Sequence, residues 1–412
     1  MKENKMKVLQ VVSSMNPDQG GVCQGIRNTL PAMASFDCDS DVVCLDGVDD
    51  TYGVADSFRV IRLGERIGPW AYSKKLRGWL KKSLADYDVV VINGLWTYHS
   101  YAVTSVISEL RREGVTNLPR VYVMPHGMLD PWFQRHPSRR LKAYRNWVYW
   151  KAAEHRTVRY ADGMLFTCRK ELELAREPFR PYCPKKEVNV GYGVPSPPGF
   201  GPQMKSAFLD ACPQAVDRPY LLFISRIHPK KGVDLLLRAY AEIAKSKKGT
   251  DVIPLLVVAG PCDSAYAQEM KELARQLHLL AATPTVNDNS TPQVVFPGML
   301  RGDAKWGAFY GCEAFVLPSH QENFGIAVVE ALACAKPVLI SKQVNIWDEI
   351  QECQACLVDD DTQAGTNRLI DRWLHLSPES QREMGQAALR CYQQHYRPES
   401  VAARFVTALS GA

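Results

Sequence analysis

The stretch that decides the fold is SHQENFGIAVVEALACAKPVLIS at residues 319–341, which follows the apolar run EAFVLPS at 313–319. The apolar run predicts a buried strand, and the segment from Phe324 onward predicts a helix. A strand that enters a helix through a short glycine-containing loop presents unpaired backbone N–H groups at the helix start, where the helix dipole favours an anion. The stretch therefore predicts an anion-binding loop in an α/β domain.

Two glutamates frame this loop. Glu322 and Glu330 are eight residues apart, which places Glu330 two turns into the helix. Gly325 allows a ligand to approach the backbone closely. One carboxylate near the anion and one farther along suit a ligand with phosphates at one end and hydroxyls at the other. The alternative is that Glu322 caps the helix and Glu330 lies on a solvated face.

A second segment, FISRIHPKKGVDLLLRAY at residues 223–240, places cations at the end of another predicted strand. Arg226 and Lys231 flank a proline-containing turn before a helix. Two cations that converge at a strand end can neutralise a diphosphate leaving group. Lys230 competes with its neighbour for this role, and an ordinary solvated charge run is the alternative.

Short β-branched runs alternate with amphipathic stretches along most of the chain. The strand-like runs are residues 7–14, 40–46, 58–64, 88–94, 120–126, 161–167, 219–225, 252–260, 293–298, 313–319 and 336–341. Their apolar character on both faces predicts parallel sheets covered by helices on each side. The Pro/Gly cluster VPSPPGFGP at 194–202 is the best linker. We therefore expect an α/β protein with two doubly wound domains facing a cleft.

Composition narrows the class of protein. The chain has 412 residues, of which 46% are hydrophobic and 23% are charged, so it is expected to be globular rather than disordered. No apolar run is long enough to span a bilayer, and the start lacks the features of a signal peptide, so we expect a cytoplasmic protein.

The net charge of +6 is unevenly distributed. Residues 1–197 hold 29 Lys and Arg against 21 Asp and Glu, a net +8, whereas the remainder holds 21 against 23, a net −2. A basic half suits a nucleotide-sugar substrate, an anionic membrane or nucleic acid, and charge alone does not choose among them. The twelve cysteines are expected to stay reduced, and the only C-x-x-C, Cys353–Cys356, lacks the second pair that zinc needs.

The segment around Glu322 and Glu330 resembles the signature of the family-4 retaining glycosyltransferases, which have the GT-B fold of two Rossmann-like domains. Their pattern is P-S-x-x-E-x-F-G-x-x-x-x-E-A-x-A-x-G-x-P-V, and the one departure here is Ala335 where glycine is usual, so the turn before Lys336 is expected to differ slightly. The same family shows R-x-x-x-x-K-G where this chain has Arg226, Lys231 and Gly232. The resemblance is strong over 215–360 and looser over 1–197.

The resemblance implies roles for these residues in donor binding. Glu322 would contact the donor sugar as a catalytic residue, and Glu330 would bond the ribose hydroxyls. The backbone expected to hold sugar and phosphate belongs to Asn323, Phe324 and Gly325. The cations expected to hold the phosphates are Arg226 and Lys231.

Two features of the first half gain a role only through the resemblance. Gly20 and Gly21 lie in a glycine-rich turn after the first predicted strand, but their spacing does not fit a dinucleotide site. His126 lies at the carboxyl end of a predicted central strand, where α/β sheets bind ligands, although a lone histidine is more often structural. The family implies that the glycines lie near the donor phosphates and that His126 is a catalytic residue near the reacting face of the sugar.

The strings INGLWTYHSYA at 92–102 and PHGMLDPW at 125–132 resemble a bacterial polysaccharide-assembly branch of this family. Trp96, His99 and Asp130 are therefore candidate residues on the acceptor side. Residues 359–361 contain a D-x-D, which binds metal in the other major glycosyltransferase fold. Here we expect an exposed acidic turn and no metal.

Basic residues interleave with aromatic ones over residues 132–160, which hold eight Lys or Arg against the single acid Glu154, and again over 73–82. Basic helices with aromatic anchors suit an anionic membrane interface. Ordinary solvated faces are the alternative. Nucleic acid suits the same composition, but no recognised nucleic-acid motif accompanies it.

Together these patterns predict an acceptor-side domain at 1–197, a donor-binding domain at 203–393 and a final helix at 394–412 that crosses back, as the resemblance implies. The expected enzyme is a retaining, metal-independent glycosyltransferase. Its only expected cofactor-like ligand is the UDP- or GDP-linked sugar that serves as substrate. The expected acceptor is a bacterial surface glycan or lipid-linked oligosaccharide, with peripheral association at the inner face of the membrane. A GT-B epimerase or hydrolase, and a non-catalytic basic binding protein, remain alternatives.

Overall fold

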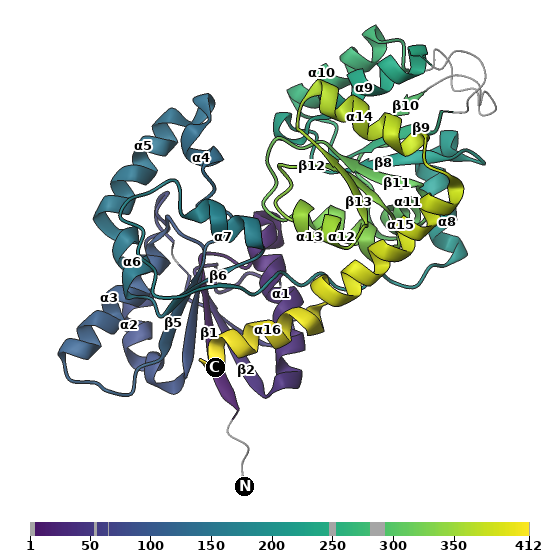
Figure 1. Ribbon diagram of the computed structural model, residues 1–412. Coiled ribbons are helices and arrows are strands. Elements are labelled where there is room, and N and C mark those ends of the chain that lie inside the picture. Colours follow the sequence, from purple (N-terminus) through teal and green to yellow (C-terminus); the bar gives the residue numbers. More distant parts are fainter. Residues whose placement is uncertain (1–4, 53–55, 65, 247–252, 281–292, 412) are drawn as a thin grey trace. The chain divides into compact units, whose positions relative to one another are not determined.

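The structure of the protein, a computed structural model, divides the chain into two compact α/β units (Figure 1). It describes residues 5–52, 56–64, 66–246, 253–280 and 293–411. Unit 1 comprises Met1–Pro195 and Tyr396–Ala412, and unit 2 comprises Ser196–His395. The chain therefore enters unit 2 once and returns to unit 1 for its last helix.

Unit 1 contains a parallel sheet of seven strands in the order β3-β2-β1-β4-β5-β6-β7. The strands are β1 Met6–Val12, β2 Cys38–Cys44, β3 Arg59–Arg62, β4 Val89–Asn93, β5 Arg120–Met124, β6 Gly163–Phe166 and β7 Glu187–Asn189. The strand order reverses between β1 and β4. Such a switch point leaves a crevice beyond the carboxyl ends of the two strands, which is where sheets of this kind bind ligands.

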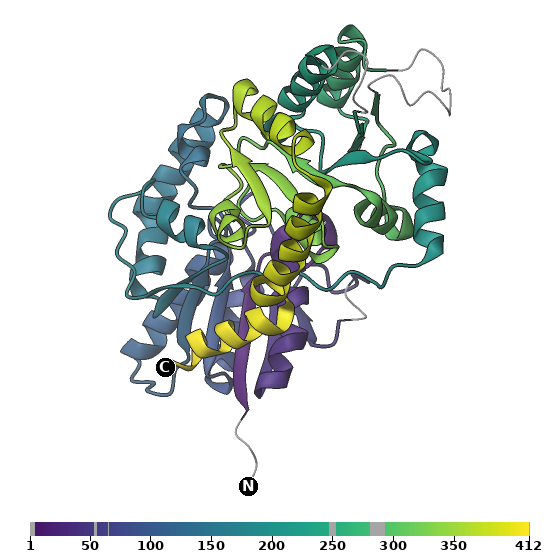
Figure 2. The same ribbon diagram turned by 45° about the vertical axis from the view of Figure 1, so that its right-hand side comes forward.

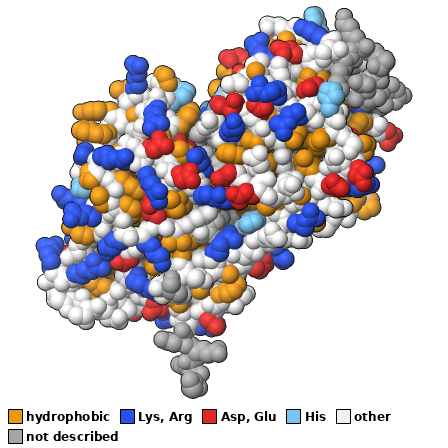
Figure 3. Space-filling view, viewed as in Figure 1, with side chains coloured by type: hydrophobic (Ala, Val, Ile, Leu, Met, Phe, Trp, Pro, Cys, Tyr) orange, Lys and Arg blue, Asp and Glu red, His pale blue; other side chains and the backbone are white. Residues whose placement is uncertain are grey.

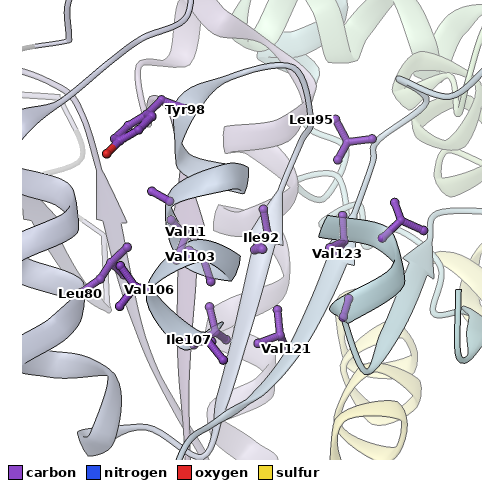
Figure 4. Close-up of a cluster of buried hydrophobic side chains, with 14 of the residues drawn as sticks. Val11, Leu80, Ile92, Leu95, Tyr98, Val103, Val106, Ile107, Val121 and Val123 are labelled. Carbon is purple, nitrogen blue, oxygen red and sulfur yellow. The ribbon is translucent and has the colours of Figure 1, made fainter. Parts of the chain in front are cut away.

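Helices cover both faces of this sheet. They are α1 Gly21–Met33, α2 Lys74–Ser83, α3 Tyr98–Arg112, α4 Trp132–Arg135, α5 Arg140–Tyr149, α6 His155–Tyr160, α7 Arg169–Ala175 and α16 Pro398–Ser410. Successive strand residues point to opposite faces, so Val11 and Ile92 join α2 and α3 in one core (Figure 4). Val12 and Val91 pack with α1 and α16 in the other core.

The last helix, α16, completes the second face of unit 1. Figure 2 shows it running beside the sheet, and its residues Phe405 and Leu409 belong to the same buried cluster as Ile26 and Leu30 of α1. The Tyr122 hydroxyl of β5 donates a hydrogen bond to the Ala408 carbonyl at 3.1 Å. Residues 286 positions apart in the chain are thus part of one core.

Unit 2 contains a parallel sheet of six strands in the order β10-β9-β8-β11-β12-β13. The strands are β8 Tyr220–Ile224, β9 Leu255–Ala259, β10 Val294–Val295, β11 Ala314–Leu317, β12 Val338–Ser341 and β13 Cys356–Asp359. The helices are α8 Pro202–Ala211, α9 Val233–Ser246, α10 Ala265–Gln276, α11 Gly302–Gly311, α12 Ile326–Ala333, α13 Trp347–Glu352, α14 Gln363–Leu374 and α15 Pro378–Cys391. Here the order reverses between β8 and β11, the two strands that precede the segments singled out in the sequence.

The expected architecture of two doubly wound α/β domains is confirmed. Among the described residues, none of the helices combines the length and the apolar character that crossing a bilayer requires. Ala335 adopts a left-handed conformation with φ of 58°, and the Lys336 N–H donates to the Ala331 carbonyl at 2.9 Å, so the turn that ends α12 forms without the usual glycine.

Candidate functional site

In unit 2, three loops meet at the carboxyl ends of β8, β11 and β12. The Ser319 hydroxyl donates to the Lys230 carbonyl at 2.8 Å, and the Ser341 hydroxyl donates to the Ser319 carbonyl at 2.5 Å. The Glu322 N–H donates to the Gln343 carbonyl at 2.9 Å. These bonds hold the Glu322 loop against both neighbouring loops, so its backbone is fixed by the sheet rather than by its own sequence.

A buried ion pair crosses between two of these loops. The side chain of Lys231 is 9% exposed, and its ammonium group donates to the Glu322 carboxylate. The neighbouring Lys230 instead donates to the Gln321 side-chain carbonyl at 2.9 Å. The two lysines, which the sequence could not tell apart, therefore have different partners, and Lys231 is the one paired with Glu322.

The residue after Lys231 must be glycine. Gly232 has φ of +66°, and a Cβ atom there would overlap the Pro318 carbonyl oxygen at the end of β11. Because the backbones of the two loops touch at this point, the Lys231 side chain is held at a fixed distance from the start of the Glu322 loop.

Arg226 follows β8 and is exposed. Within the part of the chain that the structure describes, its guanidinium group forms no ion pair. Partial burial, together with the positive charges of Arg226, Lys230 and Lys231, lowers the pKa of His228. The loop after β8 therefore places three cations, Arg226, Lys230 and Lys231, within six residues of one another.

Helix α12 begins at Ile326, shortly after Glu322, and its start belongs to the loop that Lys231 contacts through Glu322. Gly325 is its N-cap with φ of +82°, and among the described residues no side chain caps it and no acidic residue lies in its first turn. The first N–H groups of the helix are therefore available to an anion, and the helix dipole adds to the attraction.

Glu330 projects from α12 and is largely buried. Lys305 of α11 donates to its carboxylate at 2.6 Å, and the same ammonium group lies 4.6 Å from the centre of the Trp306 ring. Burial raises the pKa of Glu330, and Lys305 opposes that effect. Both glutamates of the signature are thus held by a lysine, each from a different loop or helix.

The acidic turn at 359–361 is bonded to neighbouring basic side chains. Asp359 pairs with Arg368, Asp360 pairs with Lys342 at 2.8 Å, and Asp361 accepts from His320 at 2.9 Å. Throughout the described ranges, no group of three or more His, Cys, Asp or Glu side chains is arranged to hold a metal ion.

In unit 1, a chain of polar side chains spans the carboxyl ends of β1, β4 and β5. The Asn93 amide nitrogen donates to Gln10 Oε1 at 2.7 Å, so the Asn93 oxygen faces His126 Nε2 at 2.9 Å. His126 therefore donates from Nε2, and its Nδ1 carries no proton. Burial lowers the pKa of His126 to about 4, so the ring is neutral at pH 7.

A small pocket opens beside His126. It is lined by Gln10, Gly25, Ile26, Thr29, Leu30, Asn93, Met124, His126, Gly191, Tyr192 and Phe405. Glu171 holds the loop that follows His126. Its buried carboxylate accepts from the Gly127 N–H at 2.5 Å and from the Thr167 N–H at 2.8 Å. This anchoring supports the left-handed backbone of His126, whose φ is 51°.

Gly20 and Gly21 lie at the start of α1. Gly20 has φ of +89°, and a Cβ on either glycine would meet nothing within 4 Å, so the backbone there is open. The Tyr192 hydroxyl donates to the Gly21 carbonyl at 2.7 Å. The third glycine of the turn, Gly25, is required for packing, because a Cβ there would lie 2.5 Å from the Tyr192 ring.

The three acceptor-side candidates differ in exposure. Trp96 is partly exposed. His99 is 1% exposed, and its ring nitrogens lie 2.8 Å from the Thr97 hydroxyl and 2.9 Å from the Asn93 carbonyl. Asp130 is 7% exposed and accepts from the Trp132 N–H at 2.8 Å. His99 and Asp130 therefore shape the loops from inside, and direct contact with a ligand is open mainly to Trp96.

The loop of Trp96 depends on a buried carboxyl group. Glu154 lies in the π-helical segment Trp150–Glu154 and is fully buried. It accepts from the Trp96 N–H at 2.8 Å and from the Ser100 hydroxyl at 2.7 Å. Burial raises its pKa to about 7, although both hydrogen bonds oppose the shift.

Comparison with known families agrees with this arrangement. The description "Glycosyl transferases group 1" matches residues 210–390, and "Glycosyl transferase 4-like domain" matches residues 20–190. The chain is a family-4 glycosyltransferase of the GT-B fold. One match lies in each unit, and together they include every site residue that the sequence predicted.

Curated relatives resemble this family-4 chain over part of their length. D-inositol 3-phosphate glycosyltransferase 2 of Catenulispora acidiphila is 32% identical over 146 residues, which are 35% of this chain and 32% of the relative. The D-inositol 3-phosphate glycosyltransferase of Frankia alni is 36% identical over 124 residues, 30% of this chain and 28% of the relative. The chain thus spans about a third of the length of the curated relatives it matches.

Solved structures share the fold at low identity. Sucrose-phosphate synthase of Thermosynechococcus elongatus has a TM-score of 0.64 at 19% identity, covering 98% of each chain. HepE of Anabaena, solved with UDP and glucose, has a TM-score of 0.69 at 15% identity, covering 99% of this chain and all of HepE. A glycosyltransferase of Rickettsia africae has a TM-score of 0.70 at 14% identity, covering 99% and 98%.

Sequence reasoning missed several residues that hold the candidate sites together. Asn93 ends a run of apolar residues, and a polar residue at a strand end was the available signal. Lys305 lies in the helix GDAKWGAFYG and carries no motif. Glu171 and Glu154 look like ordinary helix surface residues in the sequence, and only the fold shows that they are buried.

The pKa of Glu154 leads to a prediction about stability and pH. Its folded value of about 7 lies above the ordinary 4.5, so its contribution is present below pH 4.5 and is lost as the pH rises through 7. Glu154→Gln keeps an acceptor for Trp96 but does not ionise. Its free energy of unfolding relative to the native protein should rise between pH 5 and pH 8 by up to about 3 kcal/mol.

Urea unfolding at both pH values measures this difference, with the exposed Glu113→Gln as the control. A difference for Glu154→Gln that does not change with pH would show that the carboxyl group is ionised in the folded protein.

Proposed function

We propose that this protein transfers a sugar from a nucleotide-sugar donor to an acceptor hydroxyl with retention of anomeric configuration. The observation that carries the proposal is the arrangement in unit 2 of Arg226, the Lys231–Glu322 pair and the open start of α12. It combines positive charge, backbone N–H groups and a carboxylate at one sheet edge, which is what a diphosphate joined to a sugar requires.

In the proposed donor complex, Arg226 and Lys231 neutralise the charge that grows on the departing diphosphate. The backbone of Asn323, Phe324 and Gly325 holds the adjoining phosphate and sugar. Glu322 orients the sugar hydroxyls, and Lys231 keeps that carboxylate in place. Because Lys231 is buried and bonded before any ligand arrives, little reorganisation is needed on binding.

Glu330 would accept hydrogen bonds from the ribose hydroxyls of the donor, with Lys305 fixing the orientation of its carboxylate. The donor is proposed to be a UDP- or GDP-sugar. The structures of HepE with UDP and with UDP-glucose favour uridine through shared fold alone. No further cofactor is part of the proposal, because the two cations supply the charge neutralisation that a metal ion would otherwise provide.

The proposed chemistry takes place on one face of the sugar. The bond from the anomeric carbon to the β-phosphate oxygen breaks, the acceptor oxygen bonds to that carbon on the same face, and its proton passes to the departing oxygen. His126 is proposed to position the sugar as a neutral ring that offers Nδ1 as an acceptor. Gly20 and Gly21 leave open backbone for the phosphates and the acceptor.

The acceptor is proposed to be a bacterial surface glycan or a lipid-linked oligosaccharide. The partly exposed Trp96 is the proposed contact, with His99 and Asp130 as positioning residues. A phosphorylated inositol is the second candidate, since the curated relatives carry that activity in their names. Domain roles follow the same division, with 1–197 and 394–412 on the acceptor side and 203–393 holding the donor.

Transfer and retention of configuration can be tested in two steps. The donor is first identified by screening nucleotide-sugars for an increase in melting temperature, because a ligand that binds the folded state stabilises it. Proton NMR of the reaction with glycan and inositol-phosphate acceptors should then show a new linkage with the donor's anomeric configuration. Inversion, or sugar release or epimerisation that never depends on an acceptor, would contradict the proposal.

The two lysines provide a matched pair of variants. Lys231→Met removes the cation joined to Glu322 and should lower kcat/KM by about 100-fold or more, since it leaves the carboxylate unpaired and the diphosphate less neutralised. Glu322→Gln should lose a comparable factor. Lys230→Met, one residue away and bonded to Gln321, should stay within a few-fold of the native enzyme. Near-normal transfer by Lys231→Met and Glu322→Gln would refute the site assignment.

A further inference from the structure

The outward face of α5 in unit 1 is apolar. Leu141 is 88% exposed, Tyr144 is 68% exposed, Trp147 is 50% exposed and Val148 is 44% exposed. Figure 3 shows hydrophobic side chains interspersed with basic ones over the region where Figure 1 places α5. A solvated helix ordinarily carries polar residues on the face that points away from its core.

Helix geometry makes these residues one surface. Leu141, Tyr144 and Val148 are three and four residues apart, so they follow one another along a single stripe, and the Tyr144 and Trp147 rings stack at 6.3 Å. Asn146 and Trp150 are buried on the opposite side. We call Leu141, Tyr144, Trp147 and Val148, with the adjacent cations Arg140, Lys142, Arg145 and Lys151, the α5 face.

The cations of this region are not neutralised by the protein. In the described part of the chain, no ion pair is formed by the exposed side chains of Arg140, Lys142, Arg145, Lys151, Arg156 and Arg159. The only acid between residues 132 and 160 is Glu154, which is fully buried. The apolar stripe is therefore bordered by positive charge with no compensating carboxylate.

The other basic segment of unit 1 differs. In α2, Arg77 and Lys81 both pair with Glu109, at 2.5 and 2.7 Å. Trp79 is partly buried and packs against the core. The sequence grouped α2 with residues 132–160, whereas, of the two described helices α2 and α5, it is α5 that combines exposed apolar side chains with unpaired charge.

We infer that the α5 face binds the surface of an anionic lipid bilayer. Leucine and valine can enter the acyl boundary, tyrosine and tryptophan suit the headgroup level, and the cations match anionic headgroups. Nucleic acid would contact the cations, but a phosphate backbone offers no apolar partner for a leucine exposed on the helix face. This inference deepens the proposed function by naming the partner that presents a lipid-linked acceptor, and it needs no turnover to be tested.

Vesicle flotation tests the inference with the full chain. The native protein should bind vesicles of phosphatidylcholine with one quarter phosphatidylglycerol, and binding should fall with pure phosphatidylcholine or in 0.5 M salt. Lys142→Gln with Lys151→Gln should weaken binding about 30-fold, at about fivefold for each cation. Trp147→Ser with Leu141→Ser should weaken it tenfold or more at unchanged charge.

Matched controls lie elsewhere on the surface. Lys74→Gln with Lys82→Gln removes the same charge from α2, and Phe200→Ser removes a side chain that is 56% exposed in unit 2. Both should bind vesicles like the native protein. Equal losses from the α2 pair, loss of binding only in the charge variants, or tight binding to poly(U) RNA that the α5 cation variants alone abolish, would overturn the inference.

Binding of UDP and GDP by the same variants separates the two proposals. A protein that binds nucleotide normally but ignores anionic vesicles contradicts the membrane inference and leaves the proposed function intact. Vesicle binding without nucleotide binding contradicts the proposed function and leaves the membrane inference intact.

Discussion

The ion pair between Lys231 and Glu322 is the interaction on which the proposed donor site of this protein depends. It joins the loops after β8 and β11, the two strands at which the sheet order of unit 2 reverses. A buried ammonium or carboxylate is costly to leave alone, so each side chain fixes the other. Gly232 makes this possible, because any larger residue would push the Lys231 loop away from the Pro318 carbonyl.

In unit 1, neutral side chains rather than an ion pair connect the strand ends at the candidate site. Gln10 lies on β1, Asn93 ends β4 and His126 follows β5, and their side chains are joined by hydrogen bonds, so the partly buried imidazole is held in place without a charge. Glu171 and Glu154 hold the flanking loops through backbone N–H groups. The strand ends of unit 2 that are proposed to hold a diphosphate thus present positive charge, and the strand ends of unit 1 that are proposed to face the sugar and acceptor present neutral hydrogen-bonding groups.

The sequence predicted most of the strands because their apolar runs are short, β-branched and bounded by turns. Strand β7, Glu187–Asn189, was not predicted because an edge strand of three residues with polar positions gives little periodicity. Helix α3 begins at Tyr98, and aromatic residues in its first turn make that boundary hard to place from the sequence.

The site residues that belong to a sequence motif could be predicted, whereas the residues that hold them in place could not. The pairing of Lys231 with Glu322 joins residues 91 positions apart, and the pairing of Lys305 with Glu330 follows no spacing rule. His99 was predicted as an acceptor-side residue from its string, and its burial in the first turn of α3 could not be read from that string. Partners of this kind depend on which loops the sheet brings together, and a single sequence does not encode that in any local pattern.

The most direct test of the central claim is the affinity difference between a nucleoside diphosphate and its nucleoside. Calorimetry with UDP and uridine, and with GDP and guanosine, isolates the contribution of the two phosphates. The account predicts that the preferred diphosphate binds at least about 100-fold more tightly than its nucleoside, and that Arg226→Ala removes about tenfold or more of that gap. Equal affinities for diphosphate and nucleoside, or a gap that Arg226→Ala leaves unchanged, would contradict it.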